Sequence, residues 1–198
     1  MFRNPFRKKH YYEIKCSYTY SAQDFEGTLW EIYSHKFKKI AHIYKQEIGE
    51  KPHTFFDCGC ASGQLMVQAE KMGITAYGID IKEYKPIHPN IKIGSILHLE
   101  EPINCDLIYC NEVLSCLYEN EIPIVLEKFK SSKLLIATHL TTEDDEKAGG
   151  TTYRSNAKGH RLIKSQQWWH NRFHSSGYDS KIDPRTGCFI AIPRQREN

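Results

Sequence analysis

The stretch Thr54–Gly63, TFFDCGCASG, decides the predicted fold of this chain. Its first half is short and apolar, which predicts a buried β-strand, and its second half is rich in small residues. A helical pattern begins at Gln64 and stops at Gly73. Small residues between a strand and a helix predict a backbone that approaches a ligand closely, because a Cβ atom would collide with that ligand. The N-terminus of the helix adds unpaired N–H groups and the positive end of its dipole.

The segments around this stretch alternate between strand and helix patterns. Apolar runs predict strands and 3.6-residue spacing predicts helices. The predicted strands are 54–58, 75–80, 91–93, 106–110 and 133–138, followed by 178–182 and 188–192; the predicted helices are 25–47, 64–72, 119–129 and one capped by Ser165. The last two strands flank the turn sequence DPRTG, which is typical of a hairpin. This order predicts an α/β fold: a doubly wound, mostly parallel sheet with a C-terminal antiparallel hairpin.

Composition describes a globular chain. The 198 residues fit one domain, with 40% hydrophobic and 26% charged residues. We expect an N-terminal arm at 1–24, a single domain at 25–198 and a lid at 140–165. No apolar run approaches the roughly 20 residues of a membrane helix, and none follows the basic start to form a secretory signal. Seven cysteines, an odd number without a CxxC pair, favour reduced thiols, a cytoplasmic location and no metal site.

A carboxylate closes the second predicted strand. Asp80 would lie at the same sheet edge as the small-residue turn, where it can accept hydrogen bonds from both hydroxyls of a ribose. Gln64 occupies the position where a dinucleotide fingerprint requires its third glycine, and the turn has no Walker lysine. These features predict a nucleoside-containing cofactor. They exclude a P-loop and leave a nicotinamide-dependent oxidoreductase as the weaker alternative.

The turn 57–63, Asp80 and the segment 105–117, CDLIYCNEVLSCL, together resemble the class I S-adenosylmethionine-dependent methyltransferases. The turn is similar to the acid-x-Gly-x-Gly-x-Gly motif of that family, with Ala61 in place of the middle glycine. The segment 105–117 is similar to one that is common in small-molecule and quinone-type methyltransferases. The resemblance covers about residues 25–193 and implies the Rossmann-like, seven-strand methyltransferase fold.

The resemblance also implies a binding site for S-adenosylmethionine and its product S-adenosylhomocysteine. Its residues fall into groups for the methionine part, the ribose, the adenine and the transferred methyl. They are Asp57, Gly59, Ala61 and Gly63 for the methionine part, Asp80 for the ribose, Ile81, Ser95 and Ile96 for the adenine, and Asn111 beneath the methionine part, near the methyl. Ser95 departs from the family pattern, because many members carry an acid there.

The implied reaction is methyl transfer to a small-molecule acceptor by in-line displacement. Because a sulfonium methyl is already activated, the protein mainly has to align the acceptor. Where the acceptor must lose a proton, His139 at the end of the fifth predicted strand is the candidate base, ahead of Glu112 and His160. Two alternatives stay open: an RNA or protein methyltransferase that uses the basic arm and lid, and a non-catalytic S-adenosylmethionine-binding partner subunit. The net charge of +3 permits a nucleic-acid partner without favouring it.

Overall fold

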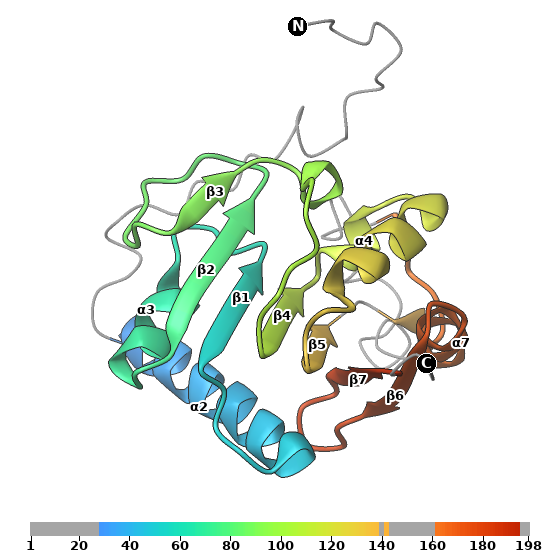
Figure 1. Ribbon diagram of the computed structural model, residues 1–198, viewed down its shortest axis with the longest axis horizontal. Helices are drawn as coiled ribbons and strands as arrows, with labels where there is room; N and C mark the ends of the chain where they lie inside the picture. Colours follow the sequence, from blue (N-terminus) through green and yellow to red (C-terminus); the bar gives the residue numbers. More distant parts are fainter. Residues whose placement is uncertain (1–27, 139–140, 143–160, 195–198) are drawn as a thin grey trace, which may run out of the picture.

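The computed structural model describes residues 28–138, 141–142 and 161–194 of the chain. They form one seven-stranded sheet with helices on both faces (Figure 1). The predicted arm at 1–24, His139 and most of the predicted lid at 140–165 lie outside the described residues.

Helices and strands alternate along the chain as the sequence predicts. The longer elements are α2 (Thr28–Ile48), β1 (Thr54–Cys58), α3 (Gln64–Lys71), β2 (Thr75–Asp80), β3 (Ile91–Ile93), β4 (Leu107–Asn111), α4 (Ile122–Phe129), β5 (Leu134–Thr138), α7 (Gln166–Ser175), β6 (Tyr178–Ile182) and β7 (Phe189–Pro193). Short 3-10 turns lie between them: η2 (Ile96–His98), η3 (Leu114–Cys116) and η4 (Glu119–Glu121).

The strand order of the sheet is β3-β2-β1-β4-β5-β7-β6. The five strands from β3 to β5 are parallel, and β7 pairs antiparallel with both β5 and β6. The order reverses between β1 and β4, and in open α/β sheets ligands bind at such a switch point, beyond the carboxyl ends of the strands. The predicted α/β fold, doubly wound with a C-terminal antiparallel hairpin, is therefore confirmed.

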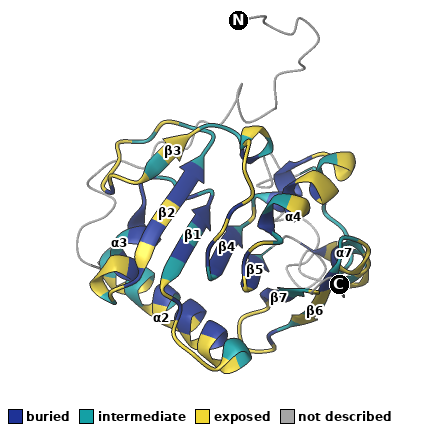
Figure 2. Cartoon of the chain, in the orientation of Figure 1, coloured by how far each residue is buried: buried dark blue, intermediate teal, exposed yellow. Residues whose placement is uncertain are grey.

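Two apolar cores lie on opposite faces of the sheet. Alternate residues of each buried strand point to opposite faces, as strand geometry requires. On one face, Phe55 and Tyr109 pack with Phe37 of α2 and with α3; on the other, Ile108 and Leu135 pack with α4 and α7. Figure 2 shows the central strands as mostly buried between these layers. The predicted burial of the first strand is confirmed, and the cysteines of the central strands are buried as well.

Several predicted boundaries are corrected by one to three residues. β4 and β5 each begin one residue later than predicted, and β7 runs one residue later at both ends. The predicted helix 119–129 is a 3-10 turn, η4, followed by α4, which has a proline in its first turn. A proline has no N–H to donate, so it is tolerated where an α-helix starts. Among the described helices, none has both the length and the apolar character needed to cross a bilayer.

Candidate cofactor site

The turn between β1 and α3 has an unusual backbone. Gly59, Ala61 and Gly63 all have positive φ angles, of 82°, 49° and 96°. Glycine adopts this left-handed region freely, whereas Ala61 adopts it at an energetic cost. The N–H groups of Gly59 and Cys60 both donate to the Ile79 carbonyl, at 2.8 and 3.2 Å. The turn is therefore held against the end of β2.

The space beside two of these glycines is filled by the protein itself. A Cβ atom on Gly59 would lie 2.5 Å from Cγ2 of Val113, and one on Gly63 would lie 2.9 Å from Cβ of His88. The sequence predicted that small residues here leave room for a ligand. The structure adds that close packing of the chain's own side chains, together with positive φ, already requires glycine at both positions.

Asp80 connects the second strand to this turn. Its Oδ2 accepts a hydrogen bond from the Ala61 N–H and its Oδ1 accepts one from the Lys82 N–H, both at 2.9 Å. Burial raises the pKa of Asp80, and the hydrogen bonds from Lys82 and Ala61 oppose that shift. The carboxylate is partly exposed, and each of its oxygens keeps a second lone pair for a further donor.

Asn111, the last residue of β4, has its side-chain oxygen surrounded by donors. Oδ1 accepts hydrogen bonds from the Thr138 hydroxyl at 2.9 Å, the Tyr109 hydroxyl at 3.0 Å and Lys36 Nζ at 3.4 Å. A lysine ammonium can only donate, so the oxygen of the amide must be the atom that faces it. The two N–H groups of the Asn111 amide are therefore directed away from these three donors.

Asp57 lies beneath this cluster and is buried, with 3% of its surface exposed. It is paired with Tyr109 across the β1–β4 ladder. Burial raises the pKa of Asp57 to about 7, while Lys36 acts to lower it and Asp80 to raise it. A carboxyl group in this state is close to half ionised at neutral pH, so its charge responds to a charged group nearby.

The residues predicted to contact the adenine lie next to Asp80 in the folded chain. The Gly94 N–H donates to the Asp80 carbonyl at 2.8 Å, which places the turn before η2 next to the end of β2. Ser95 caps η2 by accepting a hydrogen bond from the Leu97 N–H at 3.3 Å, and Ile96 is buried. Ile81 is partly exposed. The fold thus brings all the predicted cofactor residues to one edge of the sheet.

The sequence did not single out Lys36, Tyr109, Thr138 or Val113, although each contacts a predicted site residue. Tyr109 could have been found from the sequence, because it lies two residues before Asn111 and therefore on the same face of β4. Thr138 could also have been found from the sequence, because it ends β5 and pairs with Asn111 across the β4–β5 ladder. Lys36 had no such signal, because its position depends on how α2 packs on the sheet.

The predicted base, His139, lies outside the described residues, as does the weaker candidate His160. Glu112 is exposed and has a positive φ of 59°, a strained conformation for a residue with a side chain. Trp169 and Phe173 are fully buried, as their spacing indicates. Trp168, by contrast, is partly buried against Trp169 and has cations over its ring.

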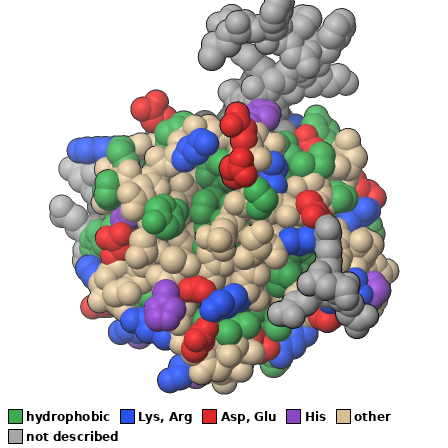
Figure 3. All heavy atoms as spheres, in the orientation of Figure 1, with side chains coloured by type: hydrophobic (Ala, Val, Ile, Leu, Met, Phe, Trp, Pro, Cys, Tyr) green, Lys and Arg blue, Asp and Glu red, His purple; other side chains and the backbone are tan. Residues whose placement is uncertain are grey.

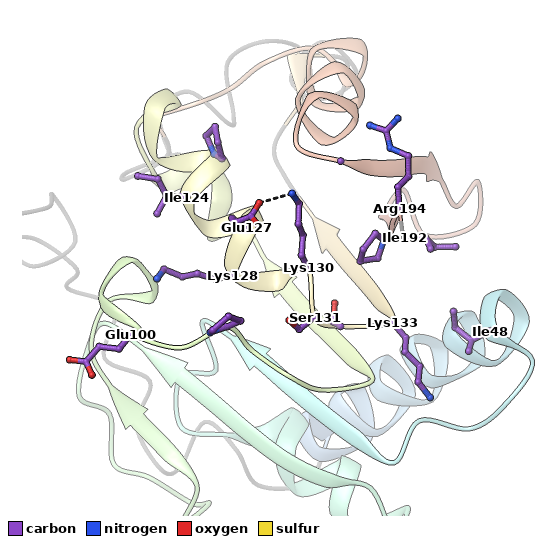
Figure 4. A pocket seen from close by; sticks show the side chains of 15 residues that line it. Ile48, Glu100, Ile124, Glu127, Lys128, Lys130, Ser131, Lys133, Ile192 and Arg194 are labelled. Atoms are coloured by element: carbon purple, nitrogen blue, oxygen red, sulfur yellow. Dashed lines mark ion pairs between the residues drawn. The ribbon is translucent and has the colours of Figure 1, made fainter. Parts of the chain in front are cut away.

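A separate groove of about 1320 Å³ lies at the opposite edge of the sheet (Figure 4). Pro102, which precedes β4, and Lys133, which precedes β5, are among the residues that line it, together with Arg194 after β7. This edge carries the amino ends of the parallel strands, away from Asp80 and Asn111. The groove therefore does not belong to the site described above.

The residues present fit a nucleoside that carries an amino-acid group. Hydrogen-bond acceptors for a ribose are present on Asp80, and the buried Nε2 of Gln64, just after the turn, has no hydrogen-bond partner among the described residues. A metal is not indicated in the described part of the chain, because no three His, Cys, Asp or Glu side chains there are grouped as ligands.

Comparison with known proteins identifies the fold. No protein-family model matches the chain, and no curated protein sequence matches it. Solved structures do match. The plantazolicin methyltransferase BpumL, in complex with a pentazolic desmethylPZN analog and S-adenosylhomocysteine, has a TM-score of 0.63 at 12% identity, with 87% of this chain and 88% of that one covered. The chain has the fold of the class I S-adenosylmethionine-dependent methyltransferases.

Two further structures show the range of proteins with this fold. Human N-acetylserotonin methyltransferase, in complex with S-adenosylmethionine, matches with a TM-score of 0.62 at 14% identity, over 84% of this chain. The match spans 54% of that protein, so this chain corresponds to about half its length. The small RNA methyltransferase HEN1 matches with a TM-score of 0.55 at 19% identity, over 82% of this chain and 25% of that one.

Proposed function

We propose that this protein binds S-adenosylmethionine and transfers its methyl group to a small-molecule acceptor. One observation carries the proposal: Asp80 at the end of β2 is hydrogen-bonded to the β1–α3 turn at Ala61, while Asn111 ends the neighbouring strand β4 on the other side of β1. A ribose acceptor, a tight turn and an oriented amide thus share one sheet edge, at the point where the strand order reverses. Solved structures with this fold hold S-adenosylmethionine or S-adenosylhomocysteine, which supports the same assignment.

Within this proposal, each residue has a defined task. Bound S-adenosylmethionine supplies a methyl group on a positively charged sulfur, which is already activated for transfer. The Asp80 carboxylate accepts hydrogen bonds from the ribose hydroxyls, and Ser95 and Ile96 flank the adenine. The turn at 57–63 seats the methionine part, and Asn111 lies beneath that part, near the methyl. The protein accelerates transfer mainly by alignment.

We further propose that the acceptor lies between this edge and the segment 140–165. The described end of that segment is tied to the site, because the N–H groups of Arg161 and Leu162 donate to the Ser115 carbonyl at 2.7 and 3.0 Å. Ser115 belongs to η3, only a few residues after Asn111. His139, directly after Thr138, is the proposed base where an acceptor must lose a proton.

A small acceptor is favoured over RNA by the distribution of charge. Lys164 and Arg172, the cations beside the ring of Trp168, both form ion pairs with Glu119. On the part of the face in Figure 3 that the described residues form, positive and negative side chains are interspersed. A surface that binds phosphates needs cations without such local partners.

Calorimetric titration of the full chain with S-adenosylhomocysteine tests the proposal, with NAD as the comparison ligand. We expect saturable binding of S-adenosylhomocysteine and none of NAD; the reverse result would overturn the assignment. Methyl-labelled S-adenosylmethionine with pooled small metabolites then tests catalysis. Binding without transfer to metabolites, RNA or protein would favour the partner-subunit alternative. Transfer to RNA that weakens steeply as salt rises would favour the RNA methyltransferase.

A further inference from the structure

Lys36 stands out in the candidate site as a cation that forms no ion pair with a described acid. Its Nζ lies 3.4 Å from Asn111 Oδ1 and 5.2 Å from the centre of the Tyr109 ring. It forms no ion pair with any acid of the described part of the chain, and one long hydrogen bond uses one of its three donors. Lys36 is half-buried, and a lysine that is taken out of water is usually paired with an opposite charge.

The surroundings of Lys36 place its charge at the ligand-binding edge. Asp57, Asn111 and Thr138 all lie on the face of the sheet that α2 covers, at or near the carboxyl ends of three adjacent strands. Burial raises the pKa of Cys188, and the charge of Lys36 acts to lower it. The Lys36 charge therefore also acts on the residue that precedes β7. The Lys36 ammonium therefore lies beside the carboxyl ends of β1, β4 and β5.

Two kinds of donor meet at this point. Lys36 has N–H groups to spare, and the three bonds to Asn111 Oδ1 leave the neighbouring amide N–H groups for another acceptor. A carboxylate can accept from an ammonium and an amide together, and a charge-assisted hydrogen bond of this kind is about twice as strong as a neutral one. Asp57 lies close by and is near half ionised, so its negative charge favours a positive group, such as the ammonium of an amino acid, beside that carboxylate.

We propose that Lys36 binds the α-carboxylate of the cofactor's amino-acid group, with Asn111 as its companion donor. This inference rests on the proposed function and adds to it a residue from α2. It predicts that α2 is part of the site and that removing the Lys36 charge acts on one end of the ligand only.

The test compares ligands that differ in the amino-acid group. S-adenosylhomocysteine carries the carboxylate, its decarboxylated analogue keeps only the ammonium, and 5′-methylthioadenosine lacks both. Calorimetry would measure their affinities for the wild type, Lys36→Met and Lys36→Arg, with Lys38→Met as the control. Lys38 is exposed on the same helix, so its removal takes away one charge without touching the site.

We expect Lys36→Met to weaken S-adenosylhomocysteine roughly tenfold or more while 5′-methylthioadenosine changes little. Decarboxylation should weaken binding to the wild type but cost little further in Lys36→Met, and Lys36→Arg should restore part of the affinity. Equal weakening of all three ligands would show a structural role for Lys36 and overturn the inference. Unchanged affinity for all three ligands would also overturn it. If Lys36→Met does not fold, the wild type and Lys36→Arg still give the carboxylate contribution. A wild type that binds none of the ligands would instead refute the proposed function, and this inference with it.

Discussion

Asp80 Oδ2 accepts a hydrogen bond from the Ala61 N–H at 2.9 Å, and this contact joins the end of β2 to the turn after β1. Ala61 is one of two described residues other than glycine with positive φ. The carboxylate therefore both stabilises a strained turn and faces the edge where the ribose is proposed to bind. Loss of Asp80 should consequently affect ligand affinity and loop order together.

Asp80→Ala is expected to weaken S-adenosylhomocysteine by about 1–3 kcal/mol, because hydrogen bonds to a charged acceptor are lost. Asp80→Asn should weaken it less, since the amide keeps one acceptor oxygen. Calorimetry measures both. Asp179→Ala, an exposed acid on β6, is the control and should leave affinity unchanged. Unaltered binding in a folded Asp80→Ala protein would remove Asp80 from the ribose site.

Gly59→Ala tests the packing of the turn. The new methyl would need positive φ and would lie 2.5 Å from Val113 Cγ2, so we expect a loss of about 1–3 kcal/mol in the free energy of unfolding. Gly187→Ala is the matched control: its φ is also positive, at 70°, but no atom lies within 4 Å of the added carbon. Urea denaturation should show a smaller loss there, and Val113→Ala should relieve part of the loss at Gly59. Equal losses at the two glycines would contradict the clash.

Asp57 should make stability depend on pH. Its pKa is raised from 3.8 to about 7, so the folded state holds the proton more tightly than the unfolded state. The stability this contributes is fully present below about pH 4 and is lost as pH rises through 7, by up to about 4 kcal/mol. Asp57→Asn stays neutral, so the difference in unfolding free energy between wild type and variant should fall over this range. Urea denaturation at pH 4.5, 6 and 7.5 measures it. A difference that grows with pH would mean that Asp57 is an ionised, paired group.

Thr138→Val removes one of the donors that orient Asn111. The valine has the same shape but no hydroxyl, so the amide loses a hydrogen bond worth about 0.5–1.5 kcal/mol. We expect a several-fold loss of S-adenosylhomocysteine affinity with a small change in melting temperature, and recovery in Thr138→Ser. Failure of serine to restore affinity would show that the methyl group of Thr138, rather than its hydroxyl, matters.

His139→Ala addresses catalysis separately from binding. If His139 removes a proton from the acceptor, turnover should fall roughly 100-fold or more while S-adenosylhomocysteine affinity changes little. The measurement needs an acceptor found in the metabolite screen. Unchanged turnover would eliminate the base role.

Much of this fold follows from local sequence. β1, β2 and β3 have the predicted bounds, because apolar runs end at glycines or at Asp80 there. The cap at Ser165 was also predictable: its hydroxyl accepts a hydrogen bond from the Trp168 N–H at 3.1 Å. The starts of β4, β5 and β7 differ by one residue, because pairing with the neighbouring strand, rather than apolar character, sets where a ladder begins.

The candidate site was predictable in part. Asp57, Asp80 and Asn111 end or nearly end strands, and parallel strands bring their carboxyl ends to one edge. Lys36 and Val113 were not predictable, since their contacts with Asn111 and Gly59 arise from the packing of α2 and of the segment after β4. Side chains that reach a site across tertiary contacts leave no local spacing in the sequence.

The most direct test of the central claim is a crystal structure of the full chain grown with S-adenosylhomocysteine. We predict that the ribose hydroxyls lie within hydrogen-bond distance of the Asp80 carboxylate and that the homocysteine group lies over the turn at 57–63. A ligand bound elsewhere, such as in the groove at the opposite sheet edge, or an Asp80 side chain turned away from the ribose, would contradict the account.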